Sequence, residues 1–369
     1  MPFLERSELL RRLQRHAAWY RYELRDGPLV SLTVRLDAET AARLEREQRA
    51  PVEDSALLAA WWTEPAQVLQ RVEAAWEATT LLGDAFPFHY VNLGPGSLAA
   101  FMGCRALPQA TTIWQEPLIP DWATAPQLHL HDDNFWWRAA QTLTRASIEA
   151  ARGRWLTGMT DIGGVLDVTS YFRTPEKLCL DLIEHPAEVK RCERAVLEAW
   201  FQVYDRLCPP LLADSGGTGS WMGTWYPGRE AALQCDFSCM ISPAMFREFA
   251  LPGLRRLAAG LDVAVYHLDG PGAIRHLEAV CEVPKVRAIQ WIPGTGASWR
   301  VADWLSLYRR IIDLGRGIWL WCEPDELDLV FDQLDPDLLF LNMAAESLER
   351  GREILARIDR LRRGRKRIQ

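Results

Sequence analysis

The sequence lacks several features that would place it in a familiar class. It has no uninterrupted apolar run of about 18 residues, and its charged first segment, 1–24, has no apolar core of a signal peptide. We therefore expect a cytoplasmic protein with no membrane span. The chain also has no Gly-x-Gly-x-x-Gly after an expected strand, no Ser-His-Asp elbow and no phosphate-cradling glycine loop. These absences argue against an open dinucleotide-binding sheet and give no support to acyl or phosphoryl transfer.

Positive charge is in deficit. The chain has 42 Lys and Arg residues against 49 Asp and Glu residues, a formal net charge of -7. A nucleic-acid-binding surface needs the opposite balance, so we expect a small-molecule substrate and no nucleic-acid partner. The eight cysteines are scattered without zinc-finger spacing, which in a chain of 369 residues fits reduced thiols better than a disulfide framework.

Tryptophan, in contrast, is abundant, with 17 residues in the chain. Many of them must lie in the core, but an indole ring can also form the wall of a pocket for a flat or sugar-like ligand. The segment 214–229 combines Trp and Tyr residues with glycines and is long for a simple connection. It is either a plain surface loop or a cover over a ligand, and both interpretations stay open.

Short apolar segments alternate with long amphipathic ones. The clearest apolar segments are 86–92, 154–161, 230–236, 262–269, 286–291, 317–323 and 338–344. Their near-continuous hydrophobicity is typical of strands buried on both faces, and the segments between them carry helix start and stop signals. About eight such units predict an α/β fold, a (β/α)8 TIM barrel, over 61–369. We expect 1–60 to be an N-terminal helical extension packed on the barrel, and 104–133 to be an inserted loop region.

Polar and aromatic residues stand at the ends of the expected strands and in the segment 214–229. In a barrel of this kind the active site lies at the carboxyl ends of the strands, so these residues form the candidate site. The catalytic candidates are His267, Asp269, Asp236 and Asp161. The candidate substrate-binding residues are Trp221, Trp225, Tyr266, Gln290, Trp291, Trp321 and Asn342.

The pair His267 and Asp269 is the centre of this prediction. Side chains alternate along a strand with period two, so the two residues point to the same side of an extended strand. With Cys322 from another strand, or with Asp236 or Glu323 as alternatives to it, they would offer ligands suited to zinc or another divalent metal. Without a metal, Asp269 could orient His267 for acid/base chemistry near neutral pH. A third interpretation is a strand end whose His and Asp bond only to the backbone.

Four segments resemble one known superfamily. They are MTDIGGVLDVTSYFRTPEKLCLDLIEHPAEVKR, LQCDFSCMISPAMFREFALPGLRRL, VAVYHLDGPGAIRHLEAV and FLNMAAESLERGREIL. They look like the uroporphyrinogen decarboxylase superfamily, in the branch that contains the zinc-dependent corrinoid:coenzyme M methyltransferases. The similarity runs from about residue 65 to the end of the chain. It implies a (β/α)8 barrel, in agreement with the alternation described above.

Carried over residue by residue, the resemblance is partial. In the methyltransferases a His-x-Cys-Gly strand end and a later cysteine bind zinc, which activates a thiol. Here His267 keeps the first place, Asp269 stands at the first cysteine and Asn342-Met343-Ala344 stands where the second is expected. Two thiolate ligands are therefore missing, and Cys322 substitutes for one only if its geometry fits. The arginine-rich N-terminal segment of the decarboxylases has no equivalent, so porphyrin decarboxylation is not expected.

Three functional hypotheses follow. The first is methyl transfer resembling that of the superfamily, with zinc or another divalent metal at His267, Asp269 and Cys322 and a corrinoid carried by a partner protein. The second is a metal-independent acid/base lyase or hydrolase that acts on a polyhydroxylated or aromatic substrate. The third is a ligand-binding barrel without catalysis. Substrate identity stays open, as does the choice between a monomer and a homodimer.

Overall fold

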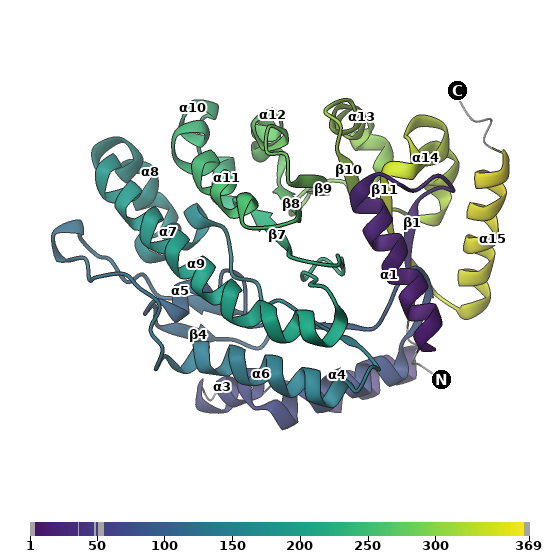
Figure 1. Cartoon of the computed structure of the whole chain (residues 1–369), viewed down its shortest axis with the longest axis horizontal. Coiled ribbons are helices and arrows are strands. Elements are labelled where there is room, and N and C mark those ends of the chain that lie inside the picture. Colours follow the sequence, from purple (N-terminus) through teal and green to yellow (C-terminus); the bar gives the residue numbers. More distant parts are fainter. Residues whose placement is uncertain (1–3, 36, 48, 51–54, 365–369) are drawn as a thin grey trace.

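The computed structural model describes residues 4–35, 37–47, 49–50 and 55–364, which form a mixed α/β fold around a mostly parallel sheet (Figure 1). In spatial order the seven strands of the main sheet are β2 (Thr80–Gly83), β1 (Leu29–Val34), β11 (Leu339–Ala345), β10 (Gly317–Trp321), β9 (Val286–Ile292), β8 (Val263–Asp269) and β7 (Glu230–Gln234). All neighbours in it are parallel except β1 and β2. Two smaller sheets pair β3 (Phe88–Tyr90) with β6 (Leu156–Gly158), and β4 (Ala106–Pro108) with β5 (Ile113–Gln115).

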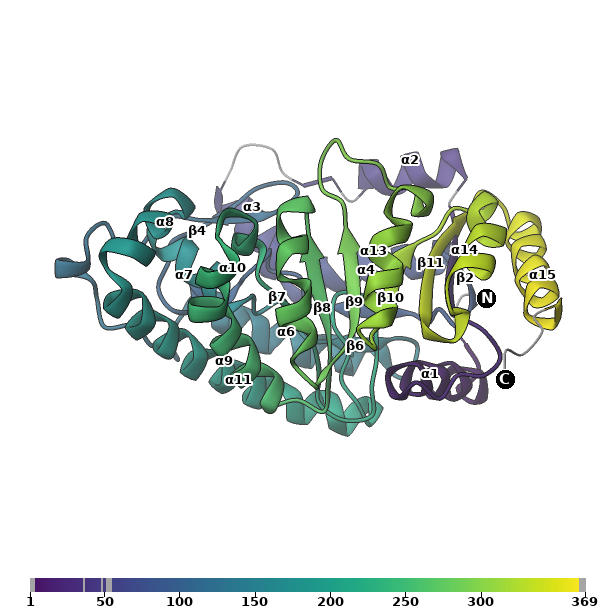
Figure 2. The ribbon, with the colours of Figure 1, turned by 90° about the horizontal axis from the view of Figure 1, so that it is seen from above.

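Helices lie on both sides of the molecule, some of them against the main sheet (Figure 1). From α1 to α8 they are Arg6–Arg21, Ala38–Glu47, Ser55–Thr63, Pro65–Ala78, Leu98–Phe101, Phe135–Ala151, Val165–Arg173 and Pro175–Glu184. From α9 to α15 they are Pro186–Ser215, Pro243–Met245, Leu251–Ala259, Leu277–Cys281, Leu305–Asp313, Leu327–Gln333 and Leu348–Gly364. Strands β7 to β11 run side by side (Figure 2), and α3, α4 and α6 lie on the far side of the molecule from α12 and α13 (Figure 1). No helix in this part of the chain has the length and apolar character needed to cross a bilayer.

The parallel strands coincide with the apolar segments of the sequence. Each of the seven expected segments coincides with one observed strand, from β3 and β6 to β11, and β9 and β11 each extend one residue beyond the expected end. The closed barrel stays a prediction, because within the described residues the main sheet ends at β2 and β7 while β3 and β6 pair only with each other. The segment 1–60 is more than a helical extension: its residues Leu29–Val34 form β1, which pairs in parallel with β11. The segment 104–133 contains the β4–β5 hairpin.

The main sheet buries both of its faces. On one face, which we call the outer face, Tyr266, Leu268 and Ile289 pack with the helices that follow the strands. On the other, the inner face, side chains such as Val265 and Trp319 form a separate cluster with aromatic residues of α1. This division follows the period-two alternation of strands that are apolar throughout.

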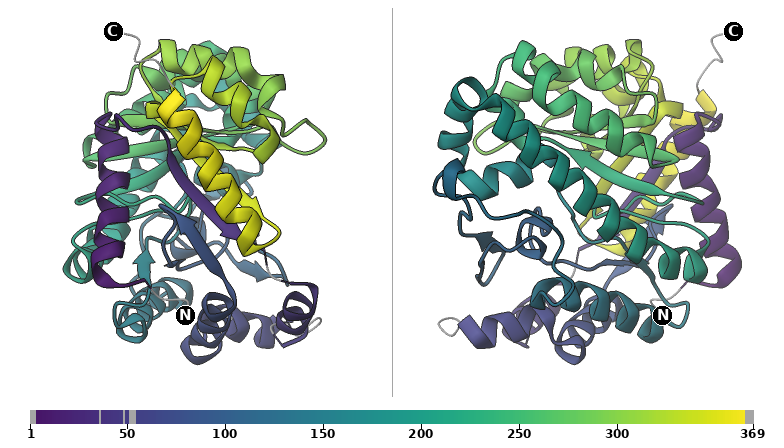
Figure 3. Two further views of the ribbon diagram at one scale, coloured as in Figure 1. Left: turned by 90° about the vertical axis from the view of Figure 1, so that its right-hand side faces the viewer. Right: turned by 60° about the vertical axis from the view of Figure 1, so that its left-hand side comes forward.

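Helix α1 packs against the amino ends of the parallel strands. Its Trp19 Nε1–H donates to the carbonyl of Leu338, just before β11, at 3.0 Å. Its Tyr20 hydroxyl donates to the carboxylate of Glu230, the first residue of β7, at 2.8 Å. The purple N-terminal segment therefore lies beside the yellow C-terminal one (Figure 3). As a result, aromatic side chains of α1 cover the inner face of the sheet at the amino ends of its strands.

The segment 214–229 lies between β6 and β7. It folds back on itself through backbone hydrogen bonds between Thr218 and Tyr226, and the carbonyl of Gly219 accepts from the backbone N–H of Met159, the residue after β6, at 2.9 Å. Glycine is required at position 219, because a Cβ there would collide with the carbonyl of Thr224. This segment thus bonds to the residue that follows β6 and leads directly into β7.

Buried polar groups fix this segment to the sheet. The carboxylate of Glu230 is fully buried, and one of its oxygens accepts hydrogen bonds from the hydroxyls of Tyr20, Ser220 and Thr224 at 2.8–3.1 Å. Its other oxygen has no hydrogen-bond partner. Burial raises the pKa of Glu230 to about 7, although the three hydroxyls oppose the shift. The carboxyl group therefore favours its neutral form below about pH 7 in the folded protein.

The raised pKa of Glu230 predicts a pH-dependent stability. The folded state holds this proton up to about pH 7 and the unfolded state only to about 4.5, so the stability it contributes is complete below 4.5 and is lost as the pH rises through 7. We expect Glu230→Gln, which keeps the acceptor oxygen, to raise the free energy of unfolding at pH 8 by up to about 3 kcal/mol relative to wild type. At pH 4.5 the two proteins should be equally stable. Urea denaturation at both pH values measures this, with the exposed Glu349→Gln as control, and equal stabilities at pH 8 would contradict it.

Candidate metal centre and acidic site

His267 lies on the inner face near the carboxyl end of β8. It is flanked in register by Gln234 of β7 and Gln290 of β9. Its Nδ1 lies 2.6 Å from Oε1 of Gln290; because an amide oxygen can only accept, Nδ1 carries the hydrogen and Nε2 keeps a free lone pair. Burial lowers the pKa of His267, an effect that the hydrogen bond to Gln290 opposes. The ring is therefore a neutral imidazole with a free nitrogen that is available as a ligand.

Two carboxylates lie near this nitrogen, one from the turn after β7 and one from β8 itself. Asp236 begins the turn after β7, and its Oδ1 lies 4.0 Å from His267 Nε2. Although the Asp236 side chain is 44% exposed, the Oδ1 atom is buried and has no hydrogen-bond partner. Asp269 ends β8 two residues after His267, on the same side of the strand. One ligand atom from each of the three residues lies within 4.8 Å of the others.

This geometry fits a metal ion better than it fits a hydrogen bond. A separation of 4.0 Å between Asp236 and His267 is too long for a hydrogen bond, but it is about twice a typical zinc–ligand distance. One imidazole nitrogen and two carboxylate oxygens form a donor set that zinc and other divalent ions accept. The hydrogen bond from Nδ1 to Gln290 orients the ring, as second partners of metal-binding histidines generally do. These three residues could hold a divalent metal.

Two further acids, the partly buried Asp161 and the buried Asp167, lie close to this group. Burial raises the pKa of Asp161, which follows β6, to about 7, although backbone N–H groups of Gly163 and Gly96 oppose the shift. Burial, followed by the charge of Asp236, likewise raises the pKa of Asp167 in α7 to about 7. One oxygen of Asp167 accepts from the backbone N–H of Phe237 at 2.9 Å, and the other is buried without a partner.

The pKa of Asp236 follows the same physics. Partial desolvation by the surrounding residues, and then the charges of Asp269 and Asp161, raise it to about 7. Three carboxyl groups with pKa values near neutrality therefore lie next to a neutral imidazole. Such a cluster is typical of functional sites, because buried like charges destabilise a fold and persist where they serve another purpose.

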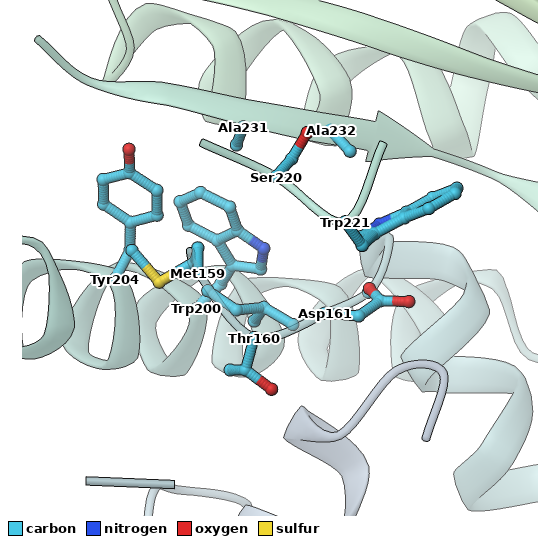
Figure 4. A pocket seen from close by; sticks show the side chains of 11 residues that line it. Met159, Thr160, Asp161, Trp200, Tyr204, Ser220, Trp221, Ala231 and Ala232 are labelled. Carbon is cyan, nitrogen blue, oxygen red and sulfur yellow. The ribbon is translucent and has the colours of Figure 1, made fainter. Parts of the chain in front are cut away.

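A small pocket joins Asp161 to the segment 214–229 (Figure 4). It lies between residues 159–163 and β7, with Trp200 and Tyr204 of α9 along one side, and Asp161 and Trp221 lie at the same end of it (Figure 4). Its volume of about 20 Å³ accommodates about one water molecule. Trp221 also contacts the His267 ring edge-to-face, with 5.2 Å between ring centroids. The indole ring therefore connects the pocket to the three potential metal ligands.

The other predicted residues are divided between the two faces of the sheet. Gln290 lies on the inner face with His267, as does Trp321, which is 42% exposed and stands in register with Asn342 of β11. Tyr266 and Trp291 lie on the outer face. The Trp291 ring packs against the ring of Trp304, with 4.9 Å between the ring centroids. Gln290, Trp321 and Asn342 therefore share the face of His267, and Gln290 contacts it directly. Tyr266 points to the other face, but Asp167 and Asp236 act on its hydroxyl, so it lies near these two acids; Trp291 packs away from them against Trp304.

Two predicted residues lie elsewhere for different reasons. The Cys322 thiol is buried, donates to the carbonyl of Glu323 at 3.4 Å and is outside the group of three potential ligands. Asp236 is instead the third potential ligand. Trp225 packs in a small cluster with Leu13 and Leu156, at the amino ends of the strands. Because the segment 214–229 precedes β7, only its tip at Trp221 reaches the site.

Sequence reasoning did not find Asp167. It stands inside α7, between apolar neighbours that are buried as it is. A carboxylate on the apolar side of an amphipathic helix was the signal that could have revealed it, since such a group needs a partner or a ligand.

Comparisons with known proteins define a fold class. No protein-family model and no curated protein matches this chain. Among solved structures, a methyltransferase from Methanosarcina mazei is similar to it with a TM-score of 0.59 and 15% sequence identity, over 95% of this chain and 98% of that chain. At this level of identity the likeness shows a shared fold along nearly the full length of both chains.

The hydrogen bond between His267 and Gln290 predicts how the imidazole titrates. In the metal-free protein we expect the pKa of His267 to lie below its usual value of 6.5. Gln290→Glu should raise it, because a carboxylate that accepts from Nδ1 stabilises the protonated ring. NMR titration of the ring proton, assigned by comparison with His267→Gln, measures both values. The expectation would be wrong if the wild-type pKa were above 6.5 or the substitution lowered it.

Proposed function

We propose that this protein is a methyltransferase-like enzyme that acts on a small molecule with the assistance of a divalent metal. The observation that carries the proposal is the buried, unpartnered Oδ1 of Asp236, which faces the free Nε2 of His267 with Asp269 beside them. The fold shared with the methyltransferase from Methanosarcina mazei and the partial sequence resemblance support the reaction class. The metal, when bound, would supply a Lewis acid that activates a nucleophile.

The proposal includes a (β/α)8 barrel as the underlying architecture. Eight strands take part in parallel pairings: β1, β3 and β6 to β11. In this interpretation the barrel is interrupted between β6 and β7, where the segment 214–229 lies, and between β1 and β3. The group of three potential ligands then lies at the carboxyl ends of the strands, where catalytic residues of such barrels are found.

The residues of this chain have separate roles in the proposal. His267 presents Nε2 to the metal and is held by Gln290 through Nδ1. Asp236 and Asp269 supply oxygen ligands where the resembling enzymes use sulfur, so the centre is harder and carries more localised charge. A corrinoid on a partner protein is the methyl carrier that the resemblance implies, and we keep it as part of the proposal. Trp221, Trp321 and Asn342 would contact the substrate.

A second candidate function rests on a different observation. The pKa values of Asp161, Asp167 and Asp236 lie near 7, where a carboxyl group can both donate and accept a proton. This favours acid/base chemistry in a lyase or hydrolase that needs no metal. The dependence of activity on metal separates the two functions.

Metal binding tests the first function. We expect one zinc ion per chain after dialysis against zinc, and a loss of affinity of at least about 100-fold in Asp236→Asn, His267→Ala and Asp269→Asn. The control Cys322→Ser should bind zinc like wild type, since its thiol is outside the group. Metal analysis and competition with a chromogenic chelator measure affinity, and loss of methylcobalamin absorbance with a thiol acceptor measures methyl transfer. Methyl transfer or any other turnover at full rate in metal-free protein would overturn the proposal.

The orienting hydrogen bond should contribute to metal affinity. Gln290→Leu removes the acceptor for Nδ1 and leaves all three ligands in place, so we expect zinc affinity to fall by about 10- to 100-fold. Gln290→Glu preserves an acceptor and should retain most of the affinity. The same chelator competition measures both variants, and wild-type affinity in Gln290→Leu would show that the ring is held by other contacts.

A further inference from the structure

The site contains more negative charge than one metal ion would engage. Asp161 and Asp167 are outside the group formed by Asp236, His267 and Asp269. Among the described residues, no Arg or Lys forms an ion pair with any of these four carboxylates, and the ion-pair partner found for them is His267 at 4.0 Å from Asp236. By contrast, the buried Asp181 forms a bidentate ion pair with Arg173 at 2.6 and 3.0 Å.

An independent observation concerns acceptor atoms without donors. Asp167 is 5% exposed, and its Oδ2 has no hydrogen-bond partner. Asp236 and His267 lie close enough to influence the pKa of Asp167, so its carboxylate lies beside the group of three potential ligands. Gln234, in register with His267, also buries an Oε1 atom without a partner. Buried acceptors without donors are costly to a fold. Two of them beside a group of acids that no Arg or Lys pairs with favour a ligand that is positively charged.

Aromatic rings lie among these carboxylates. Trp221 contacts the His267 ring and shares one end of the pocket with Asp161 (Figure 4). Tyr171 lies where Asp167, Asp161 and Asp236 all act on its hydroxyl, and Tyr90 lies beside Asp161. Aromatic faces combined with carboxylates recognise organic ammonium ions, which are weakly hydrated and bind to the π face of a ring. A bare metal ion would make no use of these rings.

We propose that the substrate of this site is an organic ammonium cation, bound next to the three potential metal ligands. The carboxylates of Asp161 and Asp167 and the rings of Trp221 and Tyr171 would hold it. This inference rests on the proposed function, because it assigns the substrate of the same site. The enclosed pocket beside Asp161 has room for about one water molecule, so most of the cation lies on the open side, where Asp236 is 44% exposed. An anionic substrate would instead require cationic side chains at the carboxylates, and no Arg or Lys of the described chain pairs with them.

The test measures the binding of defined cations to the full-length protein. Isothermal titration calorimetry with methylammonium, tetramethylammonium and choline is compared with titration of 3,3-dimethylbutan-1-ol, a neutral molecule with the shape of choline. Each titration is carried out on metal-free and on zinc-loaded protein. We expect a cation to bind at least about tenfold more tightly than the neutral molecule.

Single substitutions then locate the site. Asp161→Asn and Asp167→Asn should each weaken cation binding by about tenfold or more, and Trp221→Leu should do the same through loss of the ring. Asn at position 167 keeps an acceptor for the backbone N–H of Phe237, so this variant should fold. The exposed Asp133→Asn is the matched control and should bind like wild type. Wild-type binding in Asp161→Asn and Asp167→Asn, or equal binding of the neutral molecule, would overturn the inference.

The design separates this inference from the proposed function. Asp269→Asn should lose zinc and keep cation binding, whereas Asp161→Asn should keep zinc and lose cation binding. If wild type binds the cation but no zinc, the metal-assisted function fails and the cation site stands. If it binds zinc but none of the three cations, in either metal state, the cation inference fails alone.

Discussion

The structure depends on the side chains that cover the inner face of the main sheet. Strands that are apolar throughout must bury both faces, and the inner face is covered from the amino ends by Trp19 and Tyr20 of α1. The tip of the segment 214–229 completes this filling, with the Met222 carbonyl accepting from the Trp319 indole at 3.1 Å. Glu230 at the amino end of β7 is held by hydroxyl groups, whereas His267, Asp269 and Gln290 of the inner face lie near the carboxyl ends of their strands. The candidate site lies at the end of these strands opposite to α1.

Much of the fold followed from local patterns. Apolar segments predicted the parallel strands, and period-two alternation correctly put His267 and Asp269 on one side of β8. The same rule cannot say which of two neighbours faces inward: Gln290 and Trp291 were both predicted at the site, and only Gln290 lies on its face. That choice depends on strand register, which includes an irregularity between β8 and β9. The exchange of Cys322 for Asp236 depended on three-dimensional placement in the same way, and the closed barrel stays a prediction.

The electrostatics of the site combine features that would be unfavourable in an ordinary core. A neutral imidazole, three acids with raised pKa values and several acceptor atoms without donors lie within one region. Asp181, another buried acid, is instead paired directly with Arg173. Natural proteins tolerate such local conflicts mainly where a ligand resolves them. The proposed metal and cation both supply the positive charge that the described residues leave out.

The pairing of β1 with β11 affects when the protein can fold during synthesis. The strand Leu29–Val34 pairs with Leu339–Ala345, and Trp19 bonds to Leu338, 319 positions later. Until the last strand has left the ribosome, β1 has one open edge and the inner face lacks part of its packing, so these contacts form late and close a very long loop. The first strand to be synthesised, β1, therefore pairs completely only after the last one, β11, has been made. A nascent chain that stops short of β11 leaves one edge of β1 unpaired and exposed.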